Sequence, residues 1–227
     1  MIRAFFLSLV LFSAIAGAQP RQFTPPADLK ISREKEYAAE IKSNPDKKLV
    51  EIKDYIPGIV LDIRYATSNN FTHQPMYKQA KAFARLPVVK ALQQVEADLK
   101  TRGLGLKIYD AYRPYSVTVK FYDVVPDTNF VADPRKGSKH NRGCAIDLSL
   151  IDLKTGKELD MPTGFDSFSK TAAANYAGLP KQEIANRELL QSVMLAHGFK
   201  VIATEWWHFD FIGWQNYELL DVPFSAL

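Results

Sequence analysis

Residues 138–150 of the chain read SKHNRGCAIDLSL. A histidine, His140, is followed by a glycine suited to a turn, Gly143, and then by a run in which apolar side chains alternate with small or acidic ones. Alternation with a period of two is typical of a β-strand, because successive side chains point to opposite faces. We therefore expect a strand over Cys144–Leu150, with one apolar face and with Asp147 on a second face that leaves room for a ligand.

Asp147 needs a partner if this strand lies in the core. Burying a lone carboxylate is costly, so the side chain must meet a cation, a metal ion or several hydrogen-bond donors. Taken alone, the strand is equally compatible with an ordinary salt bridge to an arginine or lysine and with a ligand site. The choice between the two depends on what else the sequence brings to this strand.

A second cluster, TEWWHFDF at residues 204–211, combines a carboxylate and an imidazole with the most aromatic part of the chain. Three protein ligands of mixed nitrogen and oxygen type are the pattern of catalytic zinc. His140, Asp147 and His208 supply such a set. Glu205 then remains outside the ligand set, which is the place of a general base that acts on a metal-activated water.

The same cluster makes a geometric demand. Side chains three residues apart on a regular strand point to opposite faces, so Glu205 and His208 cannot both approach one metal ion from such a strand. We therefore expect a turn or a β-bulge at Glu205-Trp206, since a bulge inserts an extra residue and re-aims the side chains beside it.

Outward from these clusters, the pattern predicts a single α+β domain. The expected strands cover residues 49–52, 59–65, 107–112 and 144–150, and the expected helices cover 87–101, 116–125 and 181–196. Arg113 then lies at a strand end, and Ser116 is the expected cap of the next helix. The elements mix without a βαβ rhythm or a fixed repeat, which favours one α+β domain. We expect that domain to have a small central antiparallel sheet flanked by helices, with the metal site in a cleft.

The composition agrees with a folded globular protein. Of the 227 residues, 47% are hydrophobic and 24% are charged, which excludes intrinsic disorder. The 29 Lys and Arg are scattered among 25 Asp and Glu, so we expect no nucleic-acid partner. The one cysteine, Cys144, excludes an internal disulfide and is expected to pack in the core.

The first eighteen residues have the features of a secretory signal peptide. Arg3 precedes an uncharged, mostly apolar run, Ala4–Gly17, that closes on small residues. The run is shorter than the roughly 20 residues that a membrane-spanning helix needs. We expect cleavage after Ala18, so that residues 1–18 are removed and the mature protein is exported, periplasmic and without a membrane span.

Other parts of the chain carry no catalytic pattern. Residues 19–48 are polar and charged, and we interpret them as an extended leader with at most one short helix before a domain at 49–227. His73 lies in a turn, and His197 stands at a helix C-terminus, where an imidazole favours the helix dipole. We expect both of these histidines to be structural.

Five separated motifs occur in order along residues 49–214. They are, in chain order, Arg-Tyr-Ala-Thr-x-x-Asn-Phe at 64–71, Asp-x-Tyr-Arg-Pro at 110–114, Ser-x-His-x-x-Gly-x-Ala-x-Asp at 138–147, Met-x-Thr-x-Phe-Asp at 161–166 and Glu-Trp-Trp-His at 205–208. Together they resemble the D-alanyl-D-alanine dipeptidase family, the VanX-type zinc peptidases. Around Tyr77 the resemblance carries no residue role over.

The resemblance implies a reaction centre. His140, Asp147 and His208 would bind one zinc ion, and Glu205 would act as base and later as proton donor. Arg113 would stabilise the oxyanion of the tetrahedral intermediate, and a guanidinium held at a rigid strand end suits that role. A plain salt bridge at the strand end is the alternative for this arginine.

The resemblance also implies how the substrate is held. Asp166, with Tyr65, would bind the substrate ammonium, which would require a free amino terminus and reject longer peptides. Ser138 would line the same pocket. The alternative for Asp166 is a loop residue in an Asx turn.

The expected function is therefore zinc-dependent hydrolysis of D-alanyl-D-alanine and similar D,D-dipeptides. One alternative is a zinc D,D- or L,D-carboxypeptidase that trims peptidoglycan stem peptides and leaves the amino-terminal side of its cleft open. The other is a non-catalytic cell-wall binding module with a structural zinc, although such a site is ordinarily closed by four protein ligands. The sequence leaves open the oligomeric state and the role in dipeptide recycling, wall turnover or antibiotic resistance.

Overall fold

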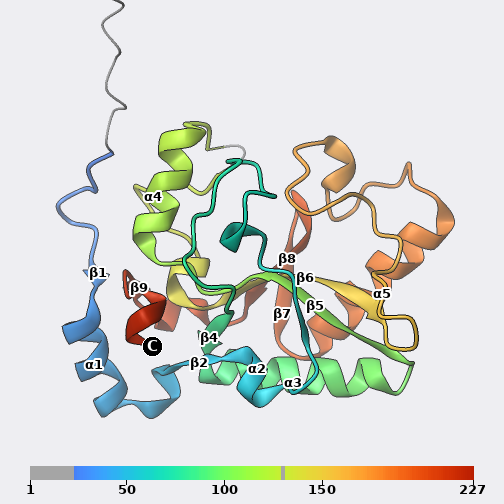
Figure 1. The fold of residues 1–227 in the computed structure, drawn as a ribbon, viewed down its shortest axis with the longest axis horizontal. Coiled ribbons are helices and arrows are strands. Elements are labelled where there is room, and N and C mark those ends of the chain that lie inside the picture. Colours follow the sequence, from blue (N-terminus) through green and yellow to red (C-terminus); the bar gives the residue numbers. More distant parts are fainter. Residues whose placement is uncertain (1–22, 129–130) are drawn as a thin grey trace, which may run out of the picture.

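The computed structural model describes residues 23–128 and 131–227, so the expected signal peptide lies outside the described residues. A five-stranded sheet forms the centre of the molecule, in the order β3-β5-β6-β8-β7 (Figure 1). Its strands are β3 (Val60–Leu61), β5 (Leu104–Asp110), β6 (Ala145–Asp152), β7 (Phe199–Ile202) and β8 (Glu205–Phe211). All neighbours are antiparallel except β3 and β5, which run parallel. The predicted α+β class is confirmed.

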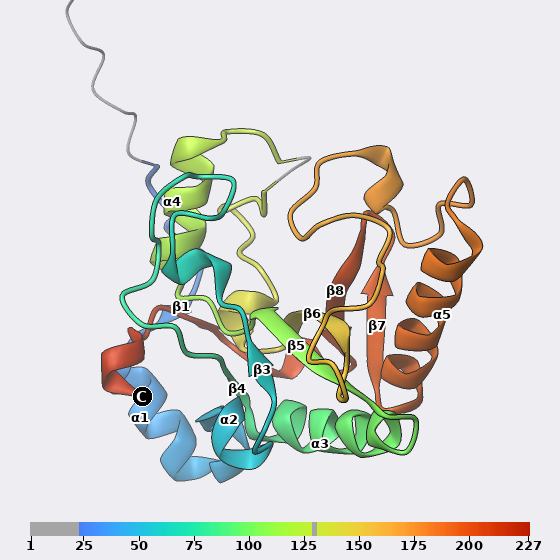
Figure 2. The same ribbon diagram turned by 45° about the vertical axis from the view of Figure 1, so that its right-hand side comes forward.

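Five α-helices in the described part of the chain surround this core or extend from it (Figure 2). They are α1 (Glu34–Ser43), α2 (Ile52–Tyr55), α3 (Leu86–Lys100), α4 (Tyr115–Val124) and α5 (Lys181–Ala196). α3 and α5 lie directly against the sheet, α3 on β5 and α5 on β7. The expected apolar positions of α3 are completely buried: Val88, Val89, Leu92, Val95 and Leu99. Among the described residues, no helix is long and apolar enough to cross a membrane.

The predicted strand at residues 59–65 is wrong over most of its length. Only β3 pairs with the sheet, and the chain then winds into a 3₁₀ helix at Arg64–Ala66. This turn buries Tyr65, whose ring contacts Phe71 and Phe121 at centroid distances of 6.1 and 4.6 Å. Aromatic burial against other segments has therefore overridden the local alternation.

The predicted cap of α4 is also different. Its N-cap residue is Pro114, and the side chain of Ser116 does not cap the helix. Instead, the backbone N–H of Ser116 donates to Asp221 Oδ1 at 2.9 Å. The acceptor comes from a segment 105 residues away, so the local sequence around the helix could not reveal it.

The polar segment at 19–48 is, from Ile31 onward, folded onto the domain. β1 (Ile31–Ser32) pairs with β9 (Leu219–Leu220), and the α1 residue Tyr37 accepts a hydrogen bond from the backbone N–H of Leu49 at 2.7 Å. Leu49 begins β2 (Leu49–Glu51), which pairs with β4 (Phe83–Arg85). Residues 31–48 are thus part of the packing of the domain.

Candidate active site

The register of the central sheet brings two predicted ligands together. Asp147 on β6 lies directly opposite His208 on β8. His140 comes from the 3₁₀ helix His140–Arg142, which ends at Gly143 with φ +68°. The positive φ favours glycine, and a Cβ atom there would lie 2.5 Å from Leu49 Cδ2, so any other residue would also have to displace that side chain.

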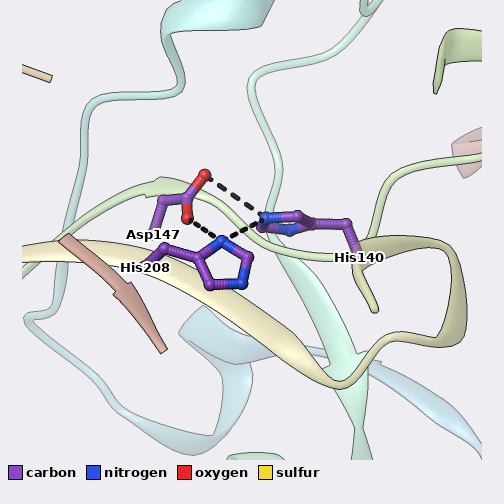
Figure 3. Close-up of side chains that lie close together, drawn as sticks. All are labelled: His140, Asp147 and His208. Atoms are coloured by element: carbon purple, nitrogen blue, oxygen red, sulfur yellow. Dashed lines mark hydrogen bonds and ion pairs between the residues drawn. The ribbon is translucent and has the colours of Figure 1, made fainter. Parts of the chain in front are cut away.

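The three side chains converge on one point, as Figure 3 shows. Their potential ligand atoms all lie within 4.8 Å of one another, and all three residues are buried. His140 Nε2 is 3.2 Å from His208 Nδ1 and 3.4 Å from Asp147 Oδ2, while His208 Nδ1 is 3.0 Å from Asp147 Oδ1. The predicted ligand set is therefore assembled in space.

Hydrogen bonds behind the imidazoles decide which nitrogens face this point. His140 Nδ1 lies 2.7 Å from the backbone oxygen of Ala111, and His208 Nε2 lies 2.9 Å from Asp210 Oδ1. With protons on those two atoms, His140 Nε2 and His208 Nδ1 are left with lone pairs directed at each other and at Asp147. Such outer partners ordinarily fix the tautomer of metal-binding histidines. Lys139 holds Asp210 in turn, at 3.3 Å.

The carboxylate of Asp147 fits a metal ion better than it fits the protein alone. Its Oδ1 atom is buried and lies 3.0 Å from His208 Nδ1, a nitrogen that can donate to it only while the imidazole carries a proton there. Burial opposes ionisation, but His140 and His208 outweigh it and keep the pKa of Asp147 below its ordinary value. Two imidazole nitrogens and a buried, ionised carboxylate oxygen form a donor set suited to a divalent transition metal.

Glu205 lies beside this set, at the predicted irregularity. Val201 of β7 pairs with Phe209, but the next residue, Ile202, pairs with Glu205, so β8 carries extra residues between the two pairs. An irregularity of the expected kind is therefore present in the pairing of β8. It places Glu205 Oε2 3.8 Å from His208 Nδ1. Burial in the cleft raises the pKa of Glu205, as is typical of carboxyl groups that exchange protons during catalysis.

Arg113 lies past the end of β5 and is buried. Its Nε and Nη2 atoms donate to Asp110 Oδ2 at 3.0 and 2.7 Å. The guanidinium carbon lies 4.7 Å from the centre of the Phe121 ring and 5.3 Å from that of Tyr65. The arginine therefore makes the salt bridge that the sequence left as an alternative, and its Nη1 atom has no hydrogen bond to the described residues.

Asp166 and Tyr65 meet as expected. The Tyr65 hydroxyl donates to Asp166 Oδ2 at 2.8 Å. Asp166 has φ +61°, a left-handed conformation that is uncommon outside glycine and that aspartate and asparagine tolerate better than other side chains. Burial raises the pKa of Asp166 to about 8, although the Tyr65 hydroxyl and the charge of Arg113 oppose this shift.

One cavity of about 650 Å³ contains all the predicted site residues in its lining: Tyr65, Arg113, Ser138, His140, Asp147, Asp166, Glu205 and His208. The Ser138 hydroxyl accepts a hydrogen bond from the backbone N–H of His140 at 3.2 Å. Its oxygen thus supports the turn that carries a ligand, in addition to facing the cavity.

Two supporting residues have roles that were not predicted. Asp110 binds Arg113, and Asp210 orients His208. Both have a signal in the sequence, because Asp110 lies three residues before Arg113 and Asp210 two residues after His208. Side chains two apart on a strand share a face, which makes the second pairing predictable in principle.

Comparisons with known proteins identify the family of this chain. Residues 45–225 match the peptidase M15 family model, described as D-Ala-D-Ala dipeptidase. The chain is 36% identical over 179 residues to the D-alanyl-D-alanine dipeptidase of Escherichia coli (strain K12), across 79% of this chain and 92% of that protein. It is 29% identical over 193 residues to the D-alanyl-D-alanine dipeptidase of Enterococcus faecalis (strain ATCC 700802 / V583), across 76% and 92%.

Among solved structures, the LD-carboxypeptidase LdcB is 20% identical, with a TM-score of 0.39 over 59% of this chain and 61% of that chain. The family match, by contrast, covers most of this chain and includes every residue that lines the cavity. This protein is therefore an enzyme that belongs to the D-Ala-D-Ala dipeptidase family of metallopeptidases.

Proposed function

We propose that the protein is a zinc-dependent dipeptidase that hydrolyses D-alanyl-D-alanine and similar D,D-dipeptides. The observation that carries the proposal is that one cavity combines the His140, Asp147 and His208 set with Glu205 on one side and the Tyr65–Asp166 pair on another. The cavity thus combines groups suited to hydrolysis of a peptide bond with groups suited to binding an ammonium group.

Each side chain has a defined part in this reaction. His140, Asp147 and His208 would hold zinc. A zinc ion, when bound, acts as a Lewis acid and lowers the pKa of a water molecule bound to it to about 7. Glu205 removes a proton from the attacking water and later delivers it to the leaving amine. Arg113 donates to the oxygen of the scissile carbonyl as negative charge develops on it.

Asp166 and Tyr65 define the class of substrate. A carboxylate and a phenol oxygen in a cavity bind an ammonium group by charge-assisted hydrogen bonds. An acyl group in place of a proton would leave Asp166 without its cation and would need space where the Tyr65 and Asp166 side chains meet, 2.8 Å apart. This pairing favours a dipeptidase over the carboxypeptidase alternative, which needs that side of the cleft open.

A dipeptide panel that varies chirality at both positions, run with and without a chelator, tests the proposal. We expect cleavage of D-Ala-D-Ala, much slower cleavage of the L,L and mixed dipeptides, and loss of activity with the chelator that added zinc restores. Equal rates across the panel, or full activity in the chelator, would reject the proposed specificity or the zinc requirement respectively. A zinc-binding module without catalysis predicts no cleavage at all.

Zinc binding to the metal-free protein at pH 7 is expected to release about one proton. Burial alone would lower the pKa of His208, but its hydrogen bonds to Asp147 and Asp210 raise that pKa to about 10. The imidazole is therefore protonated at pH 7, and a metal ion must displace the proton. Affinity should rise with pH until about pH 10. Titration calorimetry in buffers of different ionisation enthalpy measures the proton count, and a count of zero would contradict the assignment of His208.

We also propose that the mature enzyme is exported to the periplasm. The support is the run Ala4–Gly17 after Arg3, with small residues before the expected cleavage after Ala18. An exported dipeptidase suits recycling or turnover of wall-derived dipeptides, because depleting newly made dipeptide requires a cytoplasmic enzyme. Fractionation of cells that express the chain, with N-terminal sequencing of the product, tests both the location and the cleavage site.

A further inference from the structure

The carboxylate of Asp110 is hydrogen-bonded to two side chains, those of Arg113 and Tyr77. This carboxylate is buried, and its Oδ2 atom accepts both hydrogen bonds from Arg113, at 3.0 and 2.7 Å. Its other oxygen, Oδ1, accepts a hydrogen bond from the Tyr77 hydroxyl at 2.7 Å. Both oxygens of the group that holds Arg113 are thus occupied, one by the arginine and one by the tyrosine.

Tyr77 reaches this pair from outside the active-site cavity. It is absent from the lining of the 650 Å³ cavity and lines a separate cavity of about 370 Å³ with Pro114, Phe224 and other residues. Its ring packs against those of Tyr65 and Phe224, at centroid distances of 6.0 and 4.9 Å. The Tyr77 side chain is therefore held in the core, and its hydroxyl donates to Asp110 from outside the active-site cavity.

Asp110 needs that second hydrogen bond to keep its orientation. It lies opposite Asp147 in the register of β5 and β6, at a point where the pairing of the two strands is irregular. Its Oδ2 atom is also 3.9 Å from His140 Nδ1. Without the Tyr77 hydroxyl, Oδ1 would be a buried acceptor without a partner, and the carboxylate would gain by rotating toward another donor. Arg113 would move with it.

We propose that Tyr77 is a positioning residue that fixes Asp110 and thereby aims Arg113 at the developing oxyanion. This inference rests on the proposed function, because it assumes that Arg113 acts in the transition state. A displaced guanidinium weakens stabilisation of the transition state more than it weakens binding of the ground state. The effect of losing the Tyr77 hydroxyl should consequently appear in kcat and not in KM.

The first test is Tyr77→Phe in the zinc-loaded enzyme. We expect kcat for D-Ala-D-Ala to fall about 10-fold, a fraction of the roughly 100- to 1,000-fold loss typical of removing an oxyanion donor, with KM changed less than about 2-fold. Tyr37→Phe is the matched control, since both tyrosines are 6% exposed and Tyr37 also loses one hydrogen bond, to Leu49. The control should lose stability and keep its kcat. An unchanged kcat in Tyr77→Phe would overturn the proposal.

The second test repeats Tyr77→Phe in an Arg113→Ala background. If Tyr77 acts through Arg113, the second substitution lowers kcat no further, since the group that it positions is gone. A further 10-fold drop would overturn the inference and would indicate a direct role at the substrate or general damage. If Tyr77→Phe does not fold, Asp110→Asn in the same two backgrounds gives the same comparison. Failure of Arg113→Ala alone to lower kcat would instead reject the proposed role of Arg113.

Discussion

Replacing Glu205 by glutamine is expected to lower kcat about 100- to 10,000-fold while the protein keeps its metal. Glutamine has nearly the same shape but cannot take a proton from water, and a positioned general base contributes rate factors of about this size. Glu205 is outside the set of atoms that converge at the metal position, although it lies 3.8 Å from His208. Its loss should therefore leave metal binding close to that of the wild type.

Steady-state kinetics combined with zinc analysis of the same samples check this expectation. Glu188→Gln is a suitable control, because Glu188 is an exposed glutamate on α5 and does not line the cavity. It should retain wild-type kinetics. Full peptidase activity in zinc-bound Glu205→Gln would show that the base is assigned to the wrong residue.

Asp166→Asn is expected to lower kcat/KM for D-Ala-D-Ala about 150- to 5,000-fold. Asparagine tolerates the left-handed backbone at φ +61° and can still accept a hydrogen bond from Tyr65. It lacks only the charge that would pair with the substrate ammonium, and leaving one partner of a buried ion pair unpaired costs about 3–5 kcal/mol. A decrease of less than about 3-fold would contradict the assignment of Asp166 to the ammonium.

The same substitution should stabilise the metal-free protein at pH 7. Burial raises the folded-state pKa of Asp166 to about 8, above the ordinary value of 3.8. Between these values the unfolded chain is ionised while the folded chain holds the proton, so the free energy of unfolding falls as pH rises from about 4 to 8. Asparagine removes this dependence. Denaturant titrations at pH 4 and pH 7 measure it, and the two proteins should differ only at the higher pH.

The metal position could be predicted from the sequence because its parts are local. His140 and Asp147 belong to one motif, and His208 and Glu205 belong to another. The bulge followed from their spacing, since a regular strand cannot point both of the latter at one ion. What remained to be found was the register of β6 against β8, which places Asp147 opposite His208.

The parts that could not be predicted depend on contacts between distant segments. The alternation at residues 59–65 is typical of a strand. The chain nevertheless leaves the sheet there, and the ring of Tyr65 packs against those of Phe71 and Phe121. The cap of α4 is supplied by Asp221, and the hydroxyl that holds Asp110 comes from Tyr77, 33 residues earlier. The residue pattern within each segment gives no sign of a hydrogen-bond partner that comes from elsewhere in the chain.

The most direct test of the account compares free D-Ala-D-Ala with N-acetyl-D-Ala-D-Ala, as substrates of the zinc-loaded enzyme. The two differ only at the amino group that Asp166 and Tyr65 are proposed to bind. The account predicts rapid hydrolysis of the free dipeptide and a kcat/KM at least about 100-fold lower for the acetylated one. Equal kcat/KM values for the two substrates would contradict it and would favour a carboxypeptidase whose cleft is open on the amino-terminal side.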